Sequence, residues 1–564
     1  TYRSINNTKR AVFGTSDKLY AHNGDLITDI TPIVTAVTLA NVFGTSSGST
    51  RVCCSDAGHG RAVGDYVYFT STATFNAVSL STNVYPVTSV VNSGVFTISV
   101  TDAANATASD VGSATFNYLL PTGNSIATGG LGYGAAAFQA TVCASQTRAW
   151  NEPSSADASD IVFDISQWSL DNWGDDVIAN RSGGNIYYFD SDASTVPIRA
   201  TSITTSPISV NSIVISPNDR HLICLGANSY SPTATVSGTF DPMLVRWSDQ
   251  DDRTNWVPSL TTTSGEVVLT DGTKIIGGLR SRNAVHIWTD NAMWTMQFVG
   301  PPFTFRFTPV GTNCGMIAPH AAVDYNGISY WMGYDNFYRY DGQVRVLDCT
   351  VRKFIFDRLS TKYKAKVYTG VNSEFKEIIW LYASDESNVT ECDSYVIFSP
   401  ENNYWTYGTG VFTTFEDKEV FGNTITTGVS INADGDSTGN NKLFNNEPAD
   451  YYTENNRTIT SFVESADFDI EDGNQILFMN RLIPDFQLKK GSNFDGEITA
   501  KIITKKYPES SDEITKEFVL NTNTDKVNFR ARGRQAKIRV SCASNNTNWQ
   551  WGSVRLGFQP DGER

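Results

Sequence analysis

The sequence predicts an all-β protein, a β-propeller of about six or seven blades with an inserted small β-domain and a C-terminal β-sandwich. The composition includes 31 Phe, 24 Tyr and 43 Gly among many β-branched residues, and these types favour pleated sheets and turns. Short aromatic or aliphatic strands also recur along the chain, each ending in Asp, Asn or Gly. No long amphipathic helix is evident; the best short candidate is 349–363, where apolar residues fall at roughly helical spacing.

The propeller is predicted from the spacing of these strands. From residue 185 onwards they recur every roughly 40–60 residues, near the period of a four-stranded blade. A blade exposes two apolar faces and is stable only between neighbours, which favours a ring of blades. The strands lie at 18–24, 185–190, 243–249, 285–290, 336–342, 393–400 and 442–447, and further strands are expected before most of them, at 176–179, 221–225, 275–279, 328–332 and 378–382.

Changes in composition predict the domains. The gap between the first two recurring strands is too long for one blade, so residues 28–145, rich in small residues and with few charges, are expected to form an inserted small β-barrel or sandwich. Its strands are expected at 66–70, 84–91 and 95–100. Residues 1–27 should close the propeller by pairing with its last blade, and residues 146–455 should form the rest of it. Regular alternation at 497–503 and 537–540 predicts a C-terminal β-sandwich over 456–564.

Charge and cysteine content narrow the function classes. The formal net charge of −16 argues against a sequence-reading DNA binder, although solubility alone also explains it. The 8 cysteines are scattered without a CxxC pair, which predicts mostly buried thiols and folding in a reducing compartment. We expect no signal peptide, because residues 1–10 lack an apolar core, and no membrane span, because no window of ~18 apolar residues exists.

The motifs that carry chemistry are weak. Residues 44–48 (GTSSG) match the G-x-S-x-G nucleophile elbow, but Ser46 lies in a Ser/Gly/Thr run before another strand, whereas that elbow needs a following helix. Neither HExxH nor HxH occurs, and a phosphate-binding loop is absent. We therefore expect no catalytic, cofactor-binding or metal-binding residues. The five histidines, each interpreted as a turn or packing residue, are His22, His59, His221, His286 and His320.

Two charged segments allow a functional interpretation. Residues 248–256 (SDQDDRTNW) are similar to the Asp-box hairpin of sialidase propellers, which is a structural turn. The carboxylates of Asp249, Asp251 and Asp252 in this segment are typical Ca²⁺ ligands, but an Asx-type turn explains these residues as well. A second segment alternates basic residues, which would place them on one face of a strand. That face would contact phosphates or, as the acidic composition favours, acidic residues of a neighbouring subunit. Its residues are Arg530, Arg532 and Arg534, extended by Lys537 and Arg539.

Several stretches have a recognisable combination of aromatic, Asp and Gly residues. They are 149–151, 168–174 (WSLDNWG), 185–190, 246–258 (RWSDQDDRTNWVP), 287–300 (IWTDNAMWTMQFVG), 318–320, 330–333, 337–342, 377–382 and 551–564 (WGSVRLGFQPDGER). Together these stretches resemble the tail-nozzle, or packaged-DNA stabilisation, proteins of short-tailed bacteriophages (podoviruses). The insert, through His59-Gly60, Gly64-Asp65 and the strands that follow, also resembles a small β-domain common in phage tail proteins.

The resemblance implies a structural subunit and not an enzyme. Such proteins form a homohexameric ring below the portal and adaptor proteins, continue the channel for double-stranded DNA, retain the packaged genome and carry fibres or spikes. The expected location is the virion tail, after synthesis in the host cytoplasm. An acidic channel wall suits DNA passage without sequence-specific binding, since like charges repel over ~8–10 Å at physiological salt. The alternatives are a carbohydrate-binding or carbohydrate-cleaving receptor-binding tail propeller, whose two carboxylates would face each other across a cleft, and a cellular scaffold propeller.

Overall fold

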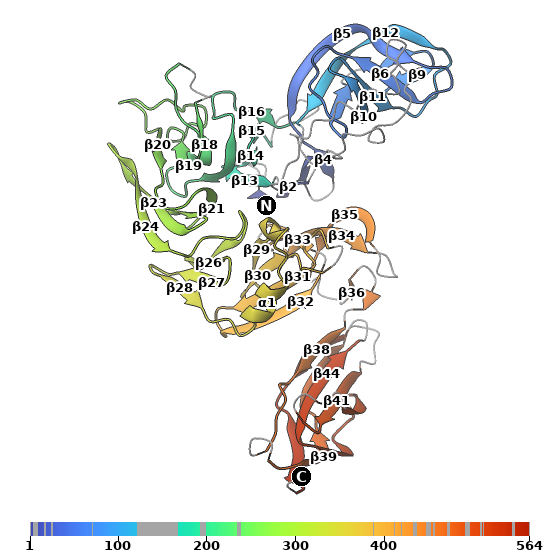
Figure 1. The fold of residues 1–564 in the computed structure, drawn as a ribbon, viewed down its shortest axis with the longest axis vertical. Coiled ribbons are helices and arrows are strands. Elements are labelled where there is room, and N and C mark those ends of the chain that lie inside the picture. The colour runs from blue at the N-terminus through green and yellow to red at the C-terminus, as the bar shows by residue number, and fades with distance from the viewer. Residues whose placement is uncertain are drawn as a thin grey trace. The chain divides into compact units, whose positions relative to one another are not determined.

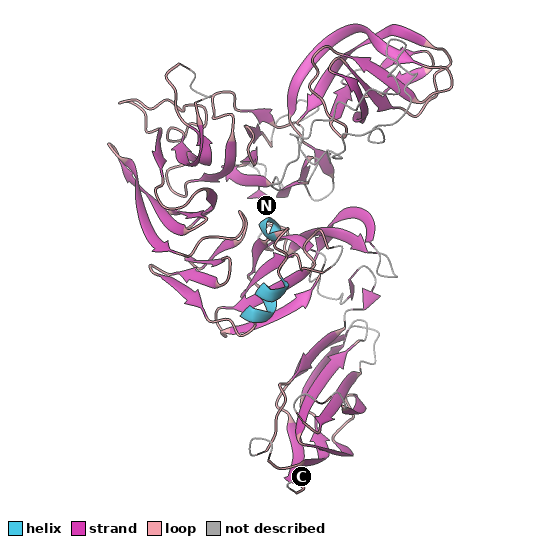
Figure 2. Ribbon diagram, in the orientation of Figure 1, coloured by secondary structure: helices cyan, strands magenta, loops and turns pink. Residues whose placement is uncertain are grey.

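The computed structural model describes most of the 564-residue chain, in two compact units, Thr1–Gly422 and Asn423–Arg564. Figure 2 shows strands in nearly every described segment, so the predicted all-β class is confirmed. The residues outside the description are 1, 4–8, 16–17, 24–25, 70–71, 121–166, 192–198, 234–237, 387–388, 411, 419, 432–436, 447–452, 455–456, 459, 471–473, 491–496, 508–509, 511–512, 544–546 and 563–564.

The described part of the first unit contains six four-stranded antiparallel sheets, the blades of the propeller. The first sheet is β1 (Tyr2–Arg3), β2 (Lys9–Gly14), β3 (Leu19–His22) and β4 (Ile27–Asp29). The second is β13 (Trp168–Trp173), β14 (Asp176–Arg181), β15 (Ile186–Phe189) and β16 (Thr201–Ser202). The third is β17 (Val210–Ile215), β18 (Leu222–Asn228), β19 (Phe240–Trp247) and β20 (Gly265–Val268).

The remaining blades follow in chain order. The fourth is β21 (Ile275–Arg280), β22 (Val285–Thr289), β23 (Ala292–Gly300) and β24 (Thr304–Thr312). The fifth is β25 (Ala322–Tyr325), β26 (Ile328–Met332), β27 (Phe337–Tyr340) and β28 (Val344–Leu347). The sixth is β29 (Tyr368–Asn372), β30 (Glu377–Tyr382), β31 (Ser394–Ser399) and β32 (Tyr404–Thr409). In Figure 1 the sheets from β13 to β32 fan around a common centre, and their first strands contact one another in order.

Helix is scarce in the described chain. A single α-helix, α1 (Arg352–Arg358), and the 3-10 helix Lys364–Lys366 join the fifth and sixth blades. The α-helix lies inside the candidate segment 349–363 and buries Ile355. β33 (Phe412–Glu416) follows the sixth blade and contacts β29.

Tryptophan occupies one recurring position in three successive blades. Trp288, Trp331 and Trp380 lie on the second strand of the fourth, fifth and sixth blades, and each is fully buried. The indole N–H of Trp331 donates to the carbonyl of Cys314 at 2.9 Å, and that of Trp380 donates to the carbonyl of Ala321 at 3.2 Å. These indoles therefore connect each blade to the chain that precedes it.

Among the described residues, the N-terminal strands pair with one another and not with the last blade, where the expectation placed them. Residues 2–29 contain four strands of their own, so they form a separate sheet. Leu19 and Ala21 of this sheet share a core with Val177 of the second blade. His22, at the end of β3, stacks on Phe421 near the end of the first unit, with ring centres 5.9 Å apart. The N-terminal sheet thus joins the early and late parts of the unit through packing.

A closed six-stranded barrel is inserted between the first and second blades. Its strand order is β10-β11-β6-β5-β12-β7, and a small hairpin, β8 (Ala73–Phe75) and β9 (Val78–Leu80), accompanies it. Stacked and edge-to-face contacts among Phe43, Phe69, Phe96 and Phe116 fill its core. The strands are β5 (Ile33–Thr45), β6 (Arg51–Ser55), β7 (Tyr66–Phe69), β10 (Val84–Asn92), β11 (Val95–Ser99) and β12 (Ala108–Leu119).

One carboxylate ties this barrel to the propeller. Asp29 pairs with Lys18 at 3.3 Å and with Arg199 at 3.1 Å. The Lys18 ammonium lies 4.8 Å from the ring centre of Tyr66 in the barrel, and the Arg199 guanidinium lies 4.9 Å from that of Tyr68. Burial would raise the pKa of Asp29, but hydrogen bonds from Thr31 and the two cations outweigh it and lower that pKa.

The second unit begins at Asn423, earlier than the expected boundary at residue 456. Its first strands are β34 (Ile425–Ile431), β35 (Ser437–Asn445), β36 (Thr453–Glu454) and β37 (Arg457–Thr458). A β-sandwich follows, in which Ala500 and Val540 of one sheet share a core with Leu477 and Met479 of the other. Its strands are β38 (Ser461–Glu464), β39 (Leu477–Ile483), β40 (Phe486–Lys490), β41 (Ile498–Lys505), β42 (Ile514–Leu520), β43 (Val527–Gly533), β44 (Gln535–Cys542), β45 (Thr547–Trp551) and β46 (Arg555–Pro560).

Across the described residues of both units, no helix is long and apolar enough to cross a membrane.

Candidate functional site

The first strands of three successive blades line a cavity of about 300 Å³ at the centre of the fan. A second cavity of about 360 Å³ has Arg280 in common with it and reaches the turn between β17 and β18. The first cavity is lined by 167–171 and Ser182 near β13 and β14, 211–214 of β17, 277–280 of β21, and Pro319 and His320. The second is lined by Asn172, Gly174, 215–218, Arg220 and Arg280.

Asp171 is the carboxylate among the lining residues of the first cavity. Its Oδ2 accepts the backbone N–H of Ile215 at 2.7 Å, and its Oδ1 accepts that of Asn172 at 2.8 Å. Arg280 lies 3.5 Å away. Burial raises the pKa of Asp171, although Arg280 and the two amides oppose this. Two backbone donors already satisfy the carboxylate, so its contacts hold β13 to β17.

His320 also lines the first cavity. Its Nε2 is 3.0 Å from the carbonyl of Trp168, and because a carbonyl can only accept, Nε2 carries the proton. Burial lowers the pKa of the imidazole, although the bond to Trp168 opposes this. A buried neutral imidazole already bonded to backbone has a packing role, as expected for this histidine.

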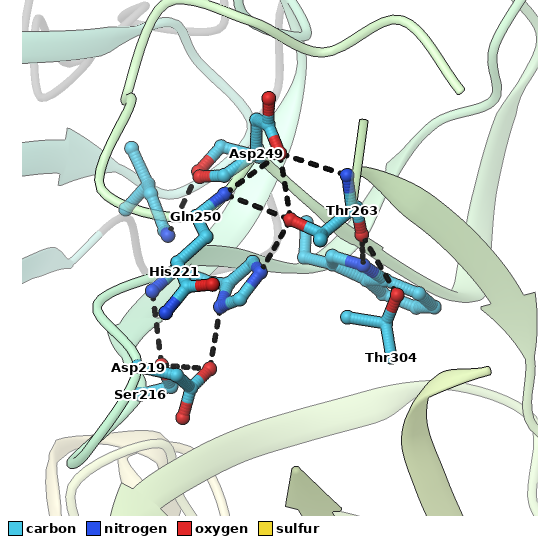
Figure 3. A network of polar contacts seen from close by, with 10 residues as sticks. Ser216, Asp219, His221, Asp249, Gln250, Thr263 and Thr304 are labelled. Carbon is cyan, nitrogen blue, oxygen red and sulfur yellow. Dashed lines mark hydrogen bonds and ion pairs between the residues drawn. The ribbon is translucent and has the colours of Figure 1, made fainter. Parts of the chain in front are cut away.

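A buried polar network in the third blade has the appearance of a catalytic triad (Figure 3). Asp219 contacts Nδ1 of His221, and Nε2 of His221 lies 2.9 Å from the hydroxyl of Thr263. A hydroxyl nucleophile needs a free approach for substrate and a base able to take its proton. His221 is fully buried, and the Thr263 hydroxyl donates to Asp249 at 2.6 Å and accepts the N–H of Gln250 at 2.9 Å. These contacts occupy the hydroxyl on all sides.

The same network joins two blades. The carbonyl of Thr263 accepts the indole N–H of Trp247 at 2.8 Å and the hydroxyl of Thr304, from the fourth blade, at 3.1 Å. Ser216 donates to Asp219 at 2.8 Å, which fixes the β17–β18 turn. The network therefore positions loops, and it offers no accessible reactive atom.

The Asp-box segment forms a structural turn. Asp249 binds the N–H groups of Gln250 and Thr263, whereas Asp251 pairs with Arg220 at 3.0 Å and Asp252 accepts from Thr254. The three carboxylates thus have separate partners. Within the described chain no group of three or more His, Cys, Asp or Glu residues is placed to hold a metal ion. Trp256, 1% exposed, packs beneath the turn, and its indole donates to the carbonyl of Arg253 at 2.9 Å.

The other candidates also have structural surroundings. Ser46 lies in the loop between β5 and β6, so no helix follows it as a nucleophile elbow requires. His59 bonds the carbonyl of Asn92 at 2.9 Å in a turn of the barrel. His286 bonds Ser329 of the next blade at 2.7 Å, and burial lowers its pKa to about 4.

Among the described cysteines, one departs from the expectation. Cys53 is disulfide-bonded, although the scattered spacing predicted unpaired thiols. Sequence spacing cannot detect such a bond, because it depends on how distant strands and loops meet. The free cysteines in the described chain are buried except for the half-buried Cys349; they are Cys54, Cys224, Cys314, Cys349, Cys392 and Cys542.

The basic stretch near the C-terminus is not one continuous strand face. Arg530 and Arg532 are exposed on β43, but Arg534 lies in the turn before β44, because the hairpin is shorter than the alternation predicted. Arg532 pairs with Asp561 at 2.8 Å. Lys537 and Arg539 both pair with Glu464 at 3.3 Å. Acidic residues of the same chain therefore already neutralise three of these cations.

Comparisons with known proteins give no family assignment. No family model and no curated protein matches the chain. Among solved structures, an endosialidase of phage phi92 is 11% identical over 92% of this chain and 76% of its own, with a TM-score of 0.20. The extracellular domain of the putative hybrid two component system BT4673 of B. thetaiotaomicron is 10% identical over 93% of this chain and 76% of its own, with a TM-score of 0.28. A Synechocystis apocarotenoid oxygenase mutant is 9% identical over 72% and 86%, with a TM-score of 0.27. Scores this low carry no functional argument.

The axial residues Asp171 and Arg280 were not singled out as site residues in the sequence. Asp171 is part of the stretch WSLDNWG, but nothing in its spacing indicates that it faces an axis. Arg280 follows the expected strand 275–279 by one residue. The order of the blades around the centre brings them together, and that order has no local sequence signal.

Proposed function

We propose that this protein is a structural subunit of the tail nozzle of a short-tailed bacteriophage. The observation that carries the proposal is where the resembling stretches lie. Trp168, Trp256, Trp288 and His320 all belong to such stretches, and each packs in a propeller core or bonds to neighbouring backbone. Residues that serve the packing of the fold in this way suit a protein that forms a wall.

The proposed subunit assembles into a homohexameric ring below portal and adaptor proteins. The ring continues the DNA channel, retains the packaged genome, supports its ejection and carries fibres or spikes. The net charge of −16 supports this role, because Lys and Arg contacts to phosphate would add affinity and slow the passage of DNA. The in-chain neutralisation of Arg532, Lys537 and Arg539 supports it further.

Mass measurement and imaging of the purified protein test the proposal. A particle with six times the mass of one chain, seen as a six-fold ring with an axial hole, is the expected result. Isolated subunits need not associate without their neighbours, so the same measurement is repeated with co-expressed portal and adaptor proteins. A protein that stays monomeric in both preparations contradicts the proposal.

A glycan assay separates this proposal from a receptor-binding propeller. Carbohydrate cleavage needs two carboxylates facing across a cleft. In the described chain Asp249, Asp251 and Asp252 have separate partners, and Asp171 is held by backbone amides. We expect no turnover of bacterial surface polysaccharide. Turnover that is lost in a single Asp or Glu variant would favour the alternative.

A further inference from the structure

The second axial cavity presents two guanidinium groups with few partners. Arg280, at the end of β21, contacts only Asp171 at 3.5 Å among the described residues and makes no hydrogen bond there. Its side chain is 45% exposed. Asp171 is held by two backbone N–H groups, and Arg280 adds a charge interaction without a hydrogen bond. Most of the five donors of Arg280 are therefore available to a ligand.

Arg220 reaches the same cavity from a backbone conformation that disfavours it. Its φ is 47°, in the left-handed region, where a residue other than Gly, Asn or Asp costs roughly 1–2 kcal/mol. Strained residues of this kind concentrate at functional sites. A glycine would form the same turn at a lower cost, so the conformation gives no reason for an arginine here. The Arg220 side chain, 52% exposed, pairs with Asp251, itself 68% exposed, and such pairs are weak. Its guanidinium also lies 6.0 Å from the ring centre of Trp173, a contact that leaves its N–H donors free.

The other lining residues are neutral. They are Asn172, Gly174, Ile215, Ser216, Pro217 and Asn218. The side-chain amides of Asn172 and Asn218 make no hydrogen bond within the described residues, so they are free to bind hydroxyl or oxyanion oxygens. The adjacent carboxylate of Asp219 is committed to Ser216 and His221. The cavity is thus a basic and amide-lined hollow in an acidic protein.

We propose that this cavity binds a small molecule through a carboxylate or phosphate group held between Arg220 and Arg280. Planar guanidinium groups match the geometry of both oxyanions. The volume of about 360 Å³ lies at the lower end of small-molecule sites, which favours a single acidic sugar or a phosphorylated metabolite. The site does not depend on the nozzle role.

Calorimetric titration of the full chain tests the proposal. The probes are inorganic phosphate, glucuronate and, as the neutral control, glucose, all at one ionic strength. We expect phosphate or glucuronate to saturate with a Kd below about 10 mM, and glucose not to bind. Binding of phosphate alone or of glucuronate alone identifies the source of the oxyanion, and either result supports the site.

Three variants make the test specific. Arg280→Gln and Arg220→Gly should each weaken binding at least tenfold. Arg220→Gly relieves the left-handed strain, so it should melt no lower than the wild type, and a loss of binding cannot then be ascribed to unfolding. Arg282→Gln is the matched control, because Arg282 is exposed, two residues from Arg280 and outside the cavity lining. The proposal is overturned if neither anion saturates, if Arg280→Gln binds like the wild type, or if Arg282→Gln weakens binding as much.

Discussion

The recurring tryptophans allow a matched measurement of what holds the blades together. Trp288 and Trp331 are both fully buried on the second strands of adjacent blades, with ring centres 5.4 Å apart. They differ in one respect. The indole N–H of Trp331 donates to Cys314, whereas that of Trp288 is buried and has no partner among the described residues. Replacing each by Phe removes the same atoms from the same core.

The magnitudes predict unequal losses of stability. Loss of the larger ring is common to both variants and costs of order 1–2 kcal/mol in transfer and cavity terms. Trp331→Phe also leaves the buried carbonyl of Cys314 without its donor, which adds about 1–3 kcal/mol. Trp288→Phe instead removes an unsatisfied buried N–H, which offsets part of its cost. We expect Trp331→Phe to be the more destabilising by about 2 kcal/mol or more.

Urea unfolding followed by far-ultraviolet circular dichroism measures the difference. The chain contains more than one domain, so midpoints of the same transition are compared at unchanged slope. Trp380→Phe is the control, because its indole donates to Ala321 at 3.2 Å and should behave like Trp331. If Trp288→Phe is as destabilising as the other two variants, the hydrogen bonds do not distinguish these positions and the reasoning is wrong.

Three further predictions follow from the domain junction and the charges. Asp29→Asn should destabilise the protein near neutral pH, because the contacts of Asp29 lower its pKa in the folded protein. That stabilisation is present above the unfolded pKa of 3.8 and is lost as the pH falls through the folded pKa, so the deficit of the variant should disappear on acidification. A deficit that stays constant in thermal melts from about pH 6 to pH 3 contradicts the role of Asp29 in joining the barrel to the propeller. Removing residues 33–119 should leave a propeller that melts cooperatively. The two ends of the removed segment already meet, because the N–H of Leu120 donates to the carbonyl of Pro32 at 2.9 Å. Loss of cooperative melting would show that the barrel is not an independent insert. The Kd of the protein for duplex DNA, measured across a salt series, should be no lower than the ~10⁻⁴–10⁻⁶ M of non-specific binders. Tight binding that is lost when the three arginines at 530, 532 and 534 are neutralised would refute the proposal that DNA slides through a channel of this protein.

Local pattern was sufficient to place most strands. The aromatic segment 285–290 contains β22, 378–382 lies within β30, and 84–91 lies within β10. Alternating or continuous apolar runs bounded by turn residues specify such strands without tertiary information. The helical candidate 349–363 likewise contains α1, because its apolar spacing is local.

Features that depend on distant contacts were not predictable. The disulfide of Cys53 and the separate N-terminal sheet both depend on which edges and loops meet in space. The turn at Arg534 ends β43 one residue early, and alternation alone does not mark such a turn. The left-handed backbone at Arg220 has no sequence signal either, because Gly or Asn is the usual residue in that conformation and an arginine does not indicate it.

Three acidic residues beside the recurring strands share one structural role, which accounts for Asp at these positions of the sequence pattern. Asp249 accepts the N–H of Thr263 at 2.8 Å and its hydroxyl at 2.6 Å. Asp393 accepts the N–H of Ser384 at 2.7 Å and its hydroxyl at 2.6 Å, and Asp290 binds Thr273 in the same two ways. Each of these carboxylates therefore fixes a loop of its own blade. The same motif, in which one residue supplies both donors, thus occurs in the third, fourth and sixth blades, and in each the carboxylate stabilises a loop.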